Sequence, residues 1–148
     1  MKVDAALATI SKLAIDTSPF IYWVEKDKRY VDRVRAIFTK IAAGAIQSFT
    51  STVTLTEVLT FPLKTGDTSV VNAFRNTLIY SGEVSLIPIS SAIAERAAEL
   101  RARYNLKTPD ALQVAVAVHQ QCDAFLTNDL GLKRVTEVQI LVLDDLTV

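Results

Sequence analysis

The stretch Thr108-Pro-Asp-Ala-Leu-Gln-Val-Ala-Val-Ala-Val-His-Gln120 is too apolar to lie on a protein surface, yet it carries a carboxylate near its start. Thr108 and Pro109 are typical of a helix start. Asp110 follows them in the first turn, where the helix dipole favours a negative charge by about 0.3 to 1 kcal/mol. A helix that is apolar almost all round must be buried. The stretch therefore predicts an internal helix, and leaves open whether Asp110 only stabilises the helix start or takes part in chemistry.

Strand-like and helical segments alternate on both sides of this stretch. Because strands that alternate with helices pair in parallel and are covered on both faces, we expect an α/β domain with three layers, α/β/α, around a central, mainly parallel sheet. The predicted strands cover residues 12–16, 46–50, 84–89, 124–127 and 139–143. The predicted helices cover residues 20–24, 27–45, 55–63, 68–79, 91–100 and 108–120, with Pro62 expected to disturb the third of them.

The composition is that of one globular domain spanning residues 1–148, in which residues 1–11 form a possible N-terminal extension of unassigned role. The formal net charge is zero, so nucleic-acid binding would need a local basic patch. A single cysteine, Cys122, excludes an internal disulfide and a CxxC metal site, and we expect a buried thiol. The sequence shows neither a signal peptide nor an apolar run long enough for a membrane span, which favours a cytoplasmic protein.

Four acidic residues fall where parallel strands end or the following helices begin. Asp16 ends the first predicted strand, and Asp129 follows the fourth by one residue. Asp110 opens the apolar helix, and Glu57 lies near the start of the helix after the second strand. Because parallel strands send their carboxyl ends to one edge of the sheet, we expect all four side chains on the same side of the molecule.

Each of these carboxylates taken alone is typical of a helix cap or a solvated helix face. Together they would repel one another, by about 4 kcal/mol for a pair about 4 Å apart at an effective dielectric constant near 20. Either protons or a divalent cation would relieve that repulsion, and oxygen ligands without His or Cys favour Mg²⁺ or Mn²⁺. A carboxylate cluster that holds such an ion is suited to hydrolysis of a phosphodiester.

Four short motifs, in this order, cover the same acidic residues: Ile15-Asp-Thr-Ser18, Thr56-Glu-Val-Leu59, Thr108-Pro-Asp-Ala-Leu-Gln113 and Phe125-Leu-Thr-Asn-Asp129. The set resembles the PIN-domain nucleases over residues 12 to 144. Its length and spacing are most similar to the single-domain VapC toxins of VapBC toxin–antitoxin pairs. The residues before the first strand are more numerous than in many such toxins.

The resemblance implies a ribonuclease in which Asp16, Glu57, Asp110 and Asp129 bind Mg²⁺ or Mn²⁺. It also implies supporting roles for the hydroxyl or amide groups of four further residues, namely Thr17, Ser18, Thr127 and Asn128. Members of the family are often homodimers and are neutralised by a cognate antitoxin protein. The expected partners are therefore an RNA substrate, a second copy of the chain and an antitoxin.

Two further polar residues lie close to the acidic motifs. Lys107, three residues before Asp110, is the best single candidate for an RNA phosphate contact, although basic residues are more often ordinary solvated positions. Gln113 lies one turn from Asp110, where it could hydrogen-bond that carboxylate or be an idle polar position.

Other functions fit the sequence less well. A PIN-like nuclease in RNA processing, outside a toxin–antitoxin system, remains open, as does a non-catalytic module that binds nucleotide or RNA. Against nucleotide binding, the four glycines form neither a GxGxxG motif nor a P-loop. A phosphatase that uses Asp-x-Asp after the first strand is disfavoured because Thr17 and Ser18 follow Asp16.

Overall fold

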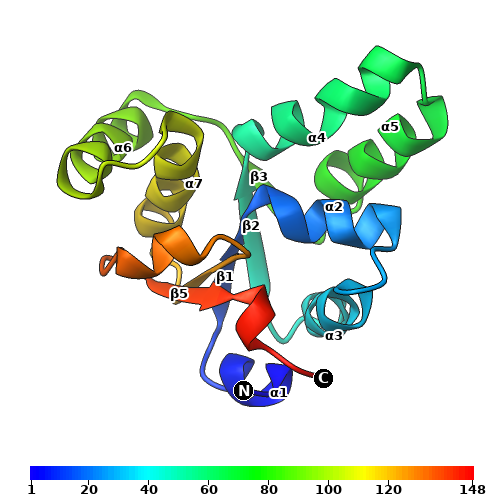
Figure 1. The fold of residues 1–148 in the computed structure, drawn as a ribbon, viewed down its shortest axis with the longest axis horizontal. Helices are drawn as coiled ribbons and strands as arrows, with labels where there is room; N and C mark the ends of the chain where they lie inside the picture. The colour runs from blue at the N-terminus through cyan, green and yellow to red at the C-terminus, as the bar shows by residue number, and fades with distance from the viewer.

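The computed structural model describes residues 1–148 and contains one five-stranded sheet (Figure 1). The strand order is β3-β2-β1-β4-β5, and every neighbouring pair is parallel. The central strand β1 therefore pairs with both β2 and β4. The strands are β1 (Lys12–Ile15), β2 (Gln47–Ser51), β3 (Val84–Ile87), β4 (Ala124–Thr127) and β5 (Gln139–Val142).

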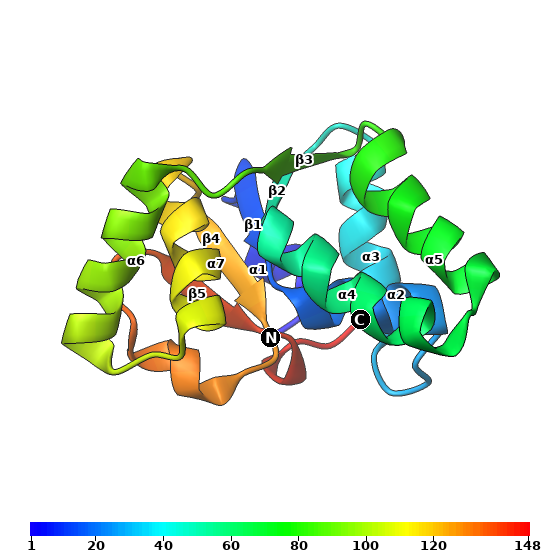
Figure 2. The ribbon, with the colours of Figure 1, turned by 90° about the horizontal axis from the view of Figure 1, so that it is seen from above.

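Helices cover both faces of the sheet, as the three-layer prediction requires (Figure 2). On one side lie α6 (Ser91–Tyr104) and α7 (Thr108–His119). On the other side lie α2 (Thr17–Glu25), α3 (Val31–Ala42), α4 (Thr52–Thr65) and α5 (Thr68–Arg75), which continues into a π-helical turn, η1 (Asn76–Tyr80). Short 3₁₀ turns, η2 (Leu130–Arg134) and η3 (Leu143–Asp145), flank β5. None of the helices combines the length and the apolar character that crossing a membrane requires.

The period-two alternation of the strands divides the core into two halves. Leu13 and Ile15 of β1 face the half built from α2, α3 and the N-terminal helix. Ala14 faces the half built from α6 and α7. On β4, Leu126 faces the half with α2 and α3, and Phe125 faces the half with α6 and α7. The apolar stretch that predicted an internal helix is indeed α7, whose residues Ala111 to Ala117 are buried except for the partly buried Leu112.

The predicted elements are confirmed, with shifts of a few residues at most of their boundaries. Helix α3 is shorter than residues 27–45, and α7 begins at Thr108, so Lys107 is its cap. Pro62 does not disturb α4, which runs through it to Thr65. Pro62 lies in the last turn before Gly66, whose φ of 74° ends the helix, so its missing N–H removes little regular helix. The expectation of a buried thiol at Cys122 is wrong, because the residue lies just after the end of α7 and is half-buried; this partial burial still raises the pKa of its thiol to about 11.

The first eleven residues form part of the packed domain. Helix α1 (Val3–Leu7) buries Val3 and Leu7 in the half of the core that Leu13 and Ile15 of β1 face. The backbone N–H of Val3 donates to the carbonyl of Thr147 at 2.8 Å, so the segment also pairs with residues near the other end of the chain (Figure 1). Residues 1–11 therefore cover part of the core half that contains α2 and α3.

Leu7→Ala tests this contribution. The substitution leaves a cavity in the core, so we expect the free energy of unfolding to fall by about 2 to 5 kcal/mol in urea denaturation. Thr9→Ala, at an exposed position of the same segment, should change it by less than about 0.5 kcal/mol. Equal effects of the two substitutions would mean that the segment is not part of the core.

Candidate active site

The structure places all four predicted carboxylates at the carboxyl edge of the sheet. Asp16 directly follows β1, and Asp129 comes two residues after β4 ends at Thr127. Asp110 is the third residue of α7, and Glu57 lies in the second turn of α4, which starts where β2 ends. The four side chains are close enough for their charges to act on one another, as the pKa values below show.

Asp16 is the most deeply placed of the four. Its Oδ1 accepts the N–H of Thr17 at 2.8 Å, which caps α2, and its Oδ2 accepts the hydroxyl of Thr127 at 2.7 Å. Burial nevertheless raises the pKa of Asp16 to about 6, because desolvation outweighs these two hydrogen bonds and the charges of Asp110 and Glu57 act in the same direction as burial. Asp16 is thus both a structural cap and a carboxyl group that gains a proton readily.

Asp110 does not act as a helix cap. No side-chain hydrogen bond caps α7, and neither carboxylate oxygen of Asp110 has a hydrogen-bond partner. The pKa of Asp110 is raised, mainly by desolvation and then by the negative charges of Asp129 and Glu57, against a smaller opposing effect of Lys107. A half-buried carboxylate without a partner, beside two others, is an electrostatic cost that the fold itself does not require.

Glu57 and Asp129 each leave one carboxylate oxygen without a hydrogen bond. The hydroxyl of Thr17 donates to Oε1 of Glu57 at 2.6 Å, and the N–H of Gly131 donates to Oδ1 of Asp129 at 2.8 Å. The second oxygen of each, with both oxygens of Asp110, is available to a cation. As the side chains stand, no three His, Cys, Asp or Glu groups converge in a ligating arrangement. The donor chemistry therefore fits a hard divalent cation, while the side chains are not closed around one position.

The residues predicted to support the site divide into two groups. The hydroxyl of Thr127 donates to Asp16, and the hydroxyl of Thr17 donates to Glu57. Asn128 instead fixes the surrounding loops, since its amide donates to the Tyr22 hydroxyl at 3.2 Å and its Oδ1 accepts the N–H of Asp144 at 2.9 Å. Ser18 makes no side-chain hydrogen bond to any of the four carboxylates.

A buried polar cluster beneath the site was not foreseen from the sequence. Gln113 does not bond to Asp110; its amide contacts the hydroxyl groups of Ser51, Thr54 and Thr17. The available signal was that Gln113 is the one uncharged polar side chain inside the apolar stretch of α7. Its partners could not be read from the sequence because they lie on other elements.

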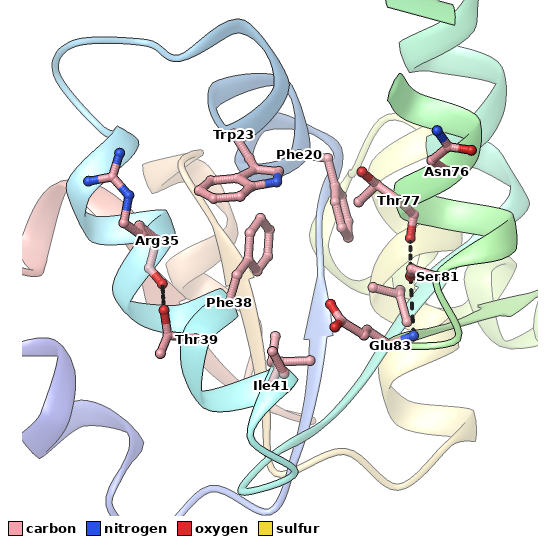
Figure 3. A pocket seen from close by; sticks show the side chains of 12 residues that line it. Phe20, Trp23, Arg35, Phe38, Thr39, Ile41, Asn76, Thr77, Ser81 and Glu83 are labelled. Carbon is pink, nitrogen blue, oxygen red and sulfur yellow. Dashed lines mark hydrogen bonds between the residues drawn. The ribbon is translucent and has the colours of Figure 1, made fainter. Parts of the chain in front are cut away.

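A cavity lies away from the acidic edge. Its volume is about 340 Å³, and it opens between α2, α3 and the π-helical turn η1 (Figure 3). Phe20, Trp23 and Phe38 form an aromatic wall, and Thr77 and Glu83 lie across from it. None of the four carboxylates lines this cavity, so it is a candidate for binding an apolar group and not for the chemistry.

A parallel α/β domain with four carboxylates gathered at the carboxyl edge of its sheet is the class of protein that the fold and the site define. Within that class, the chain belongs to the PIN domain family, whose model matches residues 13–138. The family is one of nucleases. A comparison with curated proteins finds no match.

Solved structures, among them toxin–antitoxin proteins, share the fold. A toxin–antitoxin complex from Klebsiella pneumoniae is similar with a TM-score of 0.67 and 23% identity, over 88% of this chain and 97% of that one. FitAcB from Neisseria gonorrhoeae gives a TM-score of 0.68 and 15% identity, over 88% and 97%. VapBC-5 from Mycobacterium tuberculosis gives 0.59 and 21%, over 89% and 98%. At these identities the similarity establishes the fold.

The raised pKa of Asp16 predicts a pH-dependent stability. Between its ordinary value of 3.8 and the folded value of about 6, the folded protein binds more protons than the unfolded chain. The free energy of unfolding should therefore decline as the pH rises through this window, when no divalent cation is present. In Asp16→Asn the decline should be shallower, as measured by urea denaturation from pH 4 to pH 7 in EDTA. An unchanged slope would show that Asp16 is not the group that titrates.

Proposed function

We propose that this protein is an endoribonuclease that requires Mg²⁺ or Mn²⁺ and uses Asp16, Glu57, Asp110 and Asp129 as its metal ligands. The observation that carries the proposal is the unpartnered carboxylate of Asp110, held half-buried beside Asp129 and Glu57. Such a group is costly to the fold and becomes favourable once a cation neutralises it. Membership in a family of nucleases supports the same function.

In this proposal the four carboxylates have different roles in metal binding. When bound, the divalent cation supplies an activated water and offsets negative charge on the phosphate. Asp16 holds a fixed position, since Thr127 and the Thr17 N–H anchor both of its oxygens. Glu57 and Asp129 are exposed and each has an unbonded oxygen, so they can adjust to the cation. Asp110 approaches from the opposite helical layer and completes the set.

The substrate proposal is RNA, which membership in a family of nucleases supports, and Lys107 supplies one positive charge beside the four carboxylates. The chain has no net charge, so attraction of a polyanion has to be local. Lys107 is exposed and near enough to Asp110 to lower its pKa. We assign to Lys107 a contact with an RNA phosphate beside the cleavage point, which would position the strand without reading its sequence.

We further propose that the protein is the toxin of a toxin–antitoxin pair and that a homodimer is its functional form. The complexes with similar folds contain toxin and antitoxin proteins. For the dimer, the exposed apolar side chains Phe61 and Leu63 on α4 offer a surface close to the site. The alternatives are a PIN nuclease of RNA processing and a non-catalytic RNA-binding module. Growth arrest on expression would distinguish a toxin from a nuclease of RNA processing. RNA cleavage by the purified protein would exclude a non-catalytic RNA-binding module.

RNA cleavage by the purified protein tests the proposed activity. We expect cleavage of a mixed-sequence RNA with Mg²⁺ or Mn²⁺ and none in EDTA. Asp16→Asn and Asp110→Asn should each lower the rate by about 100-fold or more, on the order of the loss of one group that stabilises transition-state charge. The readout is the rate of appearance of fragments on a denaturing gel.

The matched control for these variants is Asp4→Asn, which removes an exposed carboxylate of α1 remote from the site. It should cleave at the rate of the unmodified protein. Cleavage that persists in EDTA, or in both site variants, would overturn the proposed mechanism.

The aromatic cavity provides a test of the proposed antitoxin. We assign it to an apolar segment of that partner, because one of its walls is aromatic and it lies outside the acidic edge. Trp23 is the only tryptophan of the chain and lines the cavity, so its fluorescence reports occupancy. Titration with the protein encoded by the adjacent reading frame should shift the Trp23 emission to shorter wavelength as water is displaced.

A pair of neighbouring alanines supplies the control. Ala42 lines the cavity and Ala43 does not, and both are exposed. Ala42→Arg should weaken the partner's binding by at least about tenfold, since the long side chain would occupy part of the cavity that the partner fills. Ala43→Arg should leave binding unchanged. Equal binding by both variants would place the partner elsewhere.

A further inference from the structure

The buried amide of Gln113 is hydrogen-bonded on both of its sides. On one side, Nε2 donates to the hydroxyl oxygens of Thr54 at 2.6 Å and Thr17 at 3.1 Å. On the other side, Oε1 accepts the hydroxyl of Ser51 at 2.6 Å. Gln113 is 2% exposed, and Ser51 and Thr54 are fully buried. No buried side-chain polar atom in this cluster is left without a partner.

These bonds favour one direction for the hydroxyl hydrogen of Thr17. Its oxygen accepts an N–H from Gln113 and lies 3.4 Å from the Thr54 hydroxyl, a longer contact in which either oxygen could donate. Its single hydrogen is therefore available to Oε1 of Glu57, at 2.6 Å. The opposite orientation of the amide would direct the carbonyl oxygen at Thr17 and draw that hydrogen away from Glu57. Ser51 supports the observed orientation, because its oxygen already accepts the N–H of Val53 and its hydrogen is directed to Gln113.

We infer that Gln113 is a positioning residue that acts through Thr17 to hold Glu57 as a metal ligand. The inference rests on the proposed metal-dependent nuclease and deepens it. One oxygen of Glu57 is held by the Thr17 hydroxyl, which leaves the other, Oε2, to face a cation. Gln113 favours this arrangement because its N–H occupies the Thr17 oxygen and leaves the Thr17 hydrogen for Glu57.

An apolar side chain at this position would leave the buried hydroxyl groups of Ser51 and Thr54 without their amide partner, which costs stability for each group left unsatisfied. A loss of stability alone would therefore not distinguish a positioning role from a structural one. What an apolar side chain cannot do is direct the Thr17 hydrogen. A carboxylate at the same place cannot donate either, so Gln113→Glu would turn that hydrogen away from Glu57 with almost no change in shape.

The test is calorimetric titration with Mn²⁺ alone, which measures binding without any need for catalysis. Gln113→Glu, Gln113→Leu and Thr17→Val should each weaken Mn²⁺ binding by about 10 to 100-fold, as for other groups that orient metal ligands. Thr17→Val makes this measurement possible even if substitutions at the buried Gln113 fail to fold, which circular dichroism will show. Ser48→Ala is the matched control, because Ser48 is also buried but bonds to the Glu83 carbonyl, away from the acidic edge. It should lower the melting temperature without changing the affinity for Mn²⁺.

The double variant Gln113→Leu/Thr17→Val separates positioning from general damage. If Gln113 acts through Thr17, the double variant should bind Mn²⁺ about as weakly as either single variant, and additive losses would overturn the inference. Folded variants that bind Mn²⁺ like the unmodified protein would overturn it as well. If the unmodified protein neither binds Mn²⁺ nor cleaves RNA, the proposed function itself fails, which is a distinguishable result.

Discussion

The parallel pairing of β1 with both of its neighbours is the constraint on which the rest of the structure depends. Leu13 pairs with Ser48 on one side and with Ala124 on the other, so β2 and β4 are held in register by the same strand. That register extends past the strand end, where the N–H of Asp16 donates to the Leu126 carbonyl at 2.9 Å. A one-residue slip would exchange the two faces of β1 and turn Asp16 away from Thr127.

Capping and site geometry are combined in the same side chains. Asp16 caps α2 and Asp129 caps η2, so the simplest structural explanation of each residue is correct and does not compete with a functional one. Asp110 and Glu57 cap no helix, and they lie beside the other two carboxylates from α7 and α4. The fold thus holds two carboxylates rigidly and brings two more beside them at an electrostatic cost, which is typical of functional sites.

The sequence predicted what depends on local pattern and failed where partners are distant. Alternating strands and helices were enough to place the four carboxylates at one edge, because parallel pairing leaves no other arrangement. The role of Gln113 could not be predicted, since its partners lie on β2, α2 and α4 and meet it only in the folded sheet. The same holds for residues 1–11, whose backbone partner, Thr147, is remote in the chain. The continuation of α4 through Pro62 was not predicted, because the sequence does not show how many helical residues follow a proline near a helix end.

The pairing of Val3 with Thr147 also bears on the order of folding. It closes a loop of nearly the whole chain, and the entropy of closing such a loop has to be repaid by contacts that already hold the two ends near each other. We therefore expect the pairing to form late, once the core contacts of Val3 and Leu7 hold the N-terminal helix in place. Protection of the Val3 amide from hydrogen exchange would then report completed folding, whereas amides within α7 would report only the early assembly of the core.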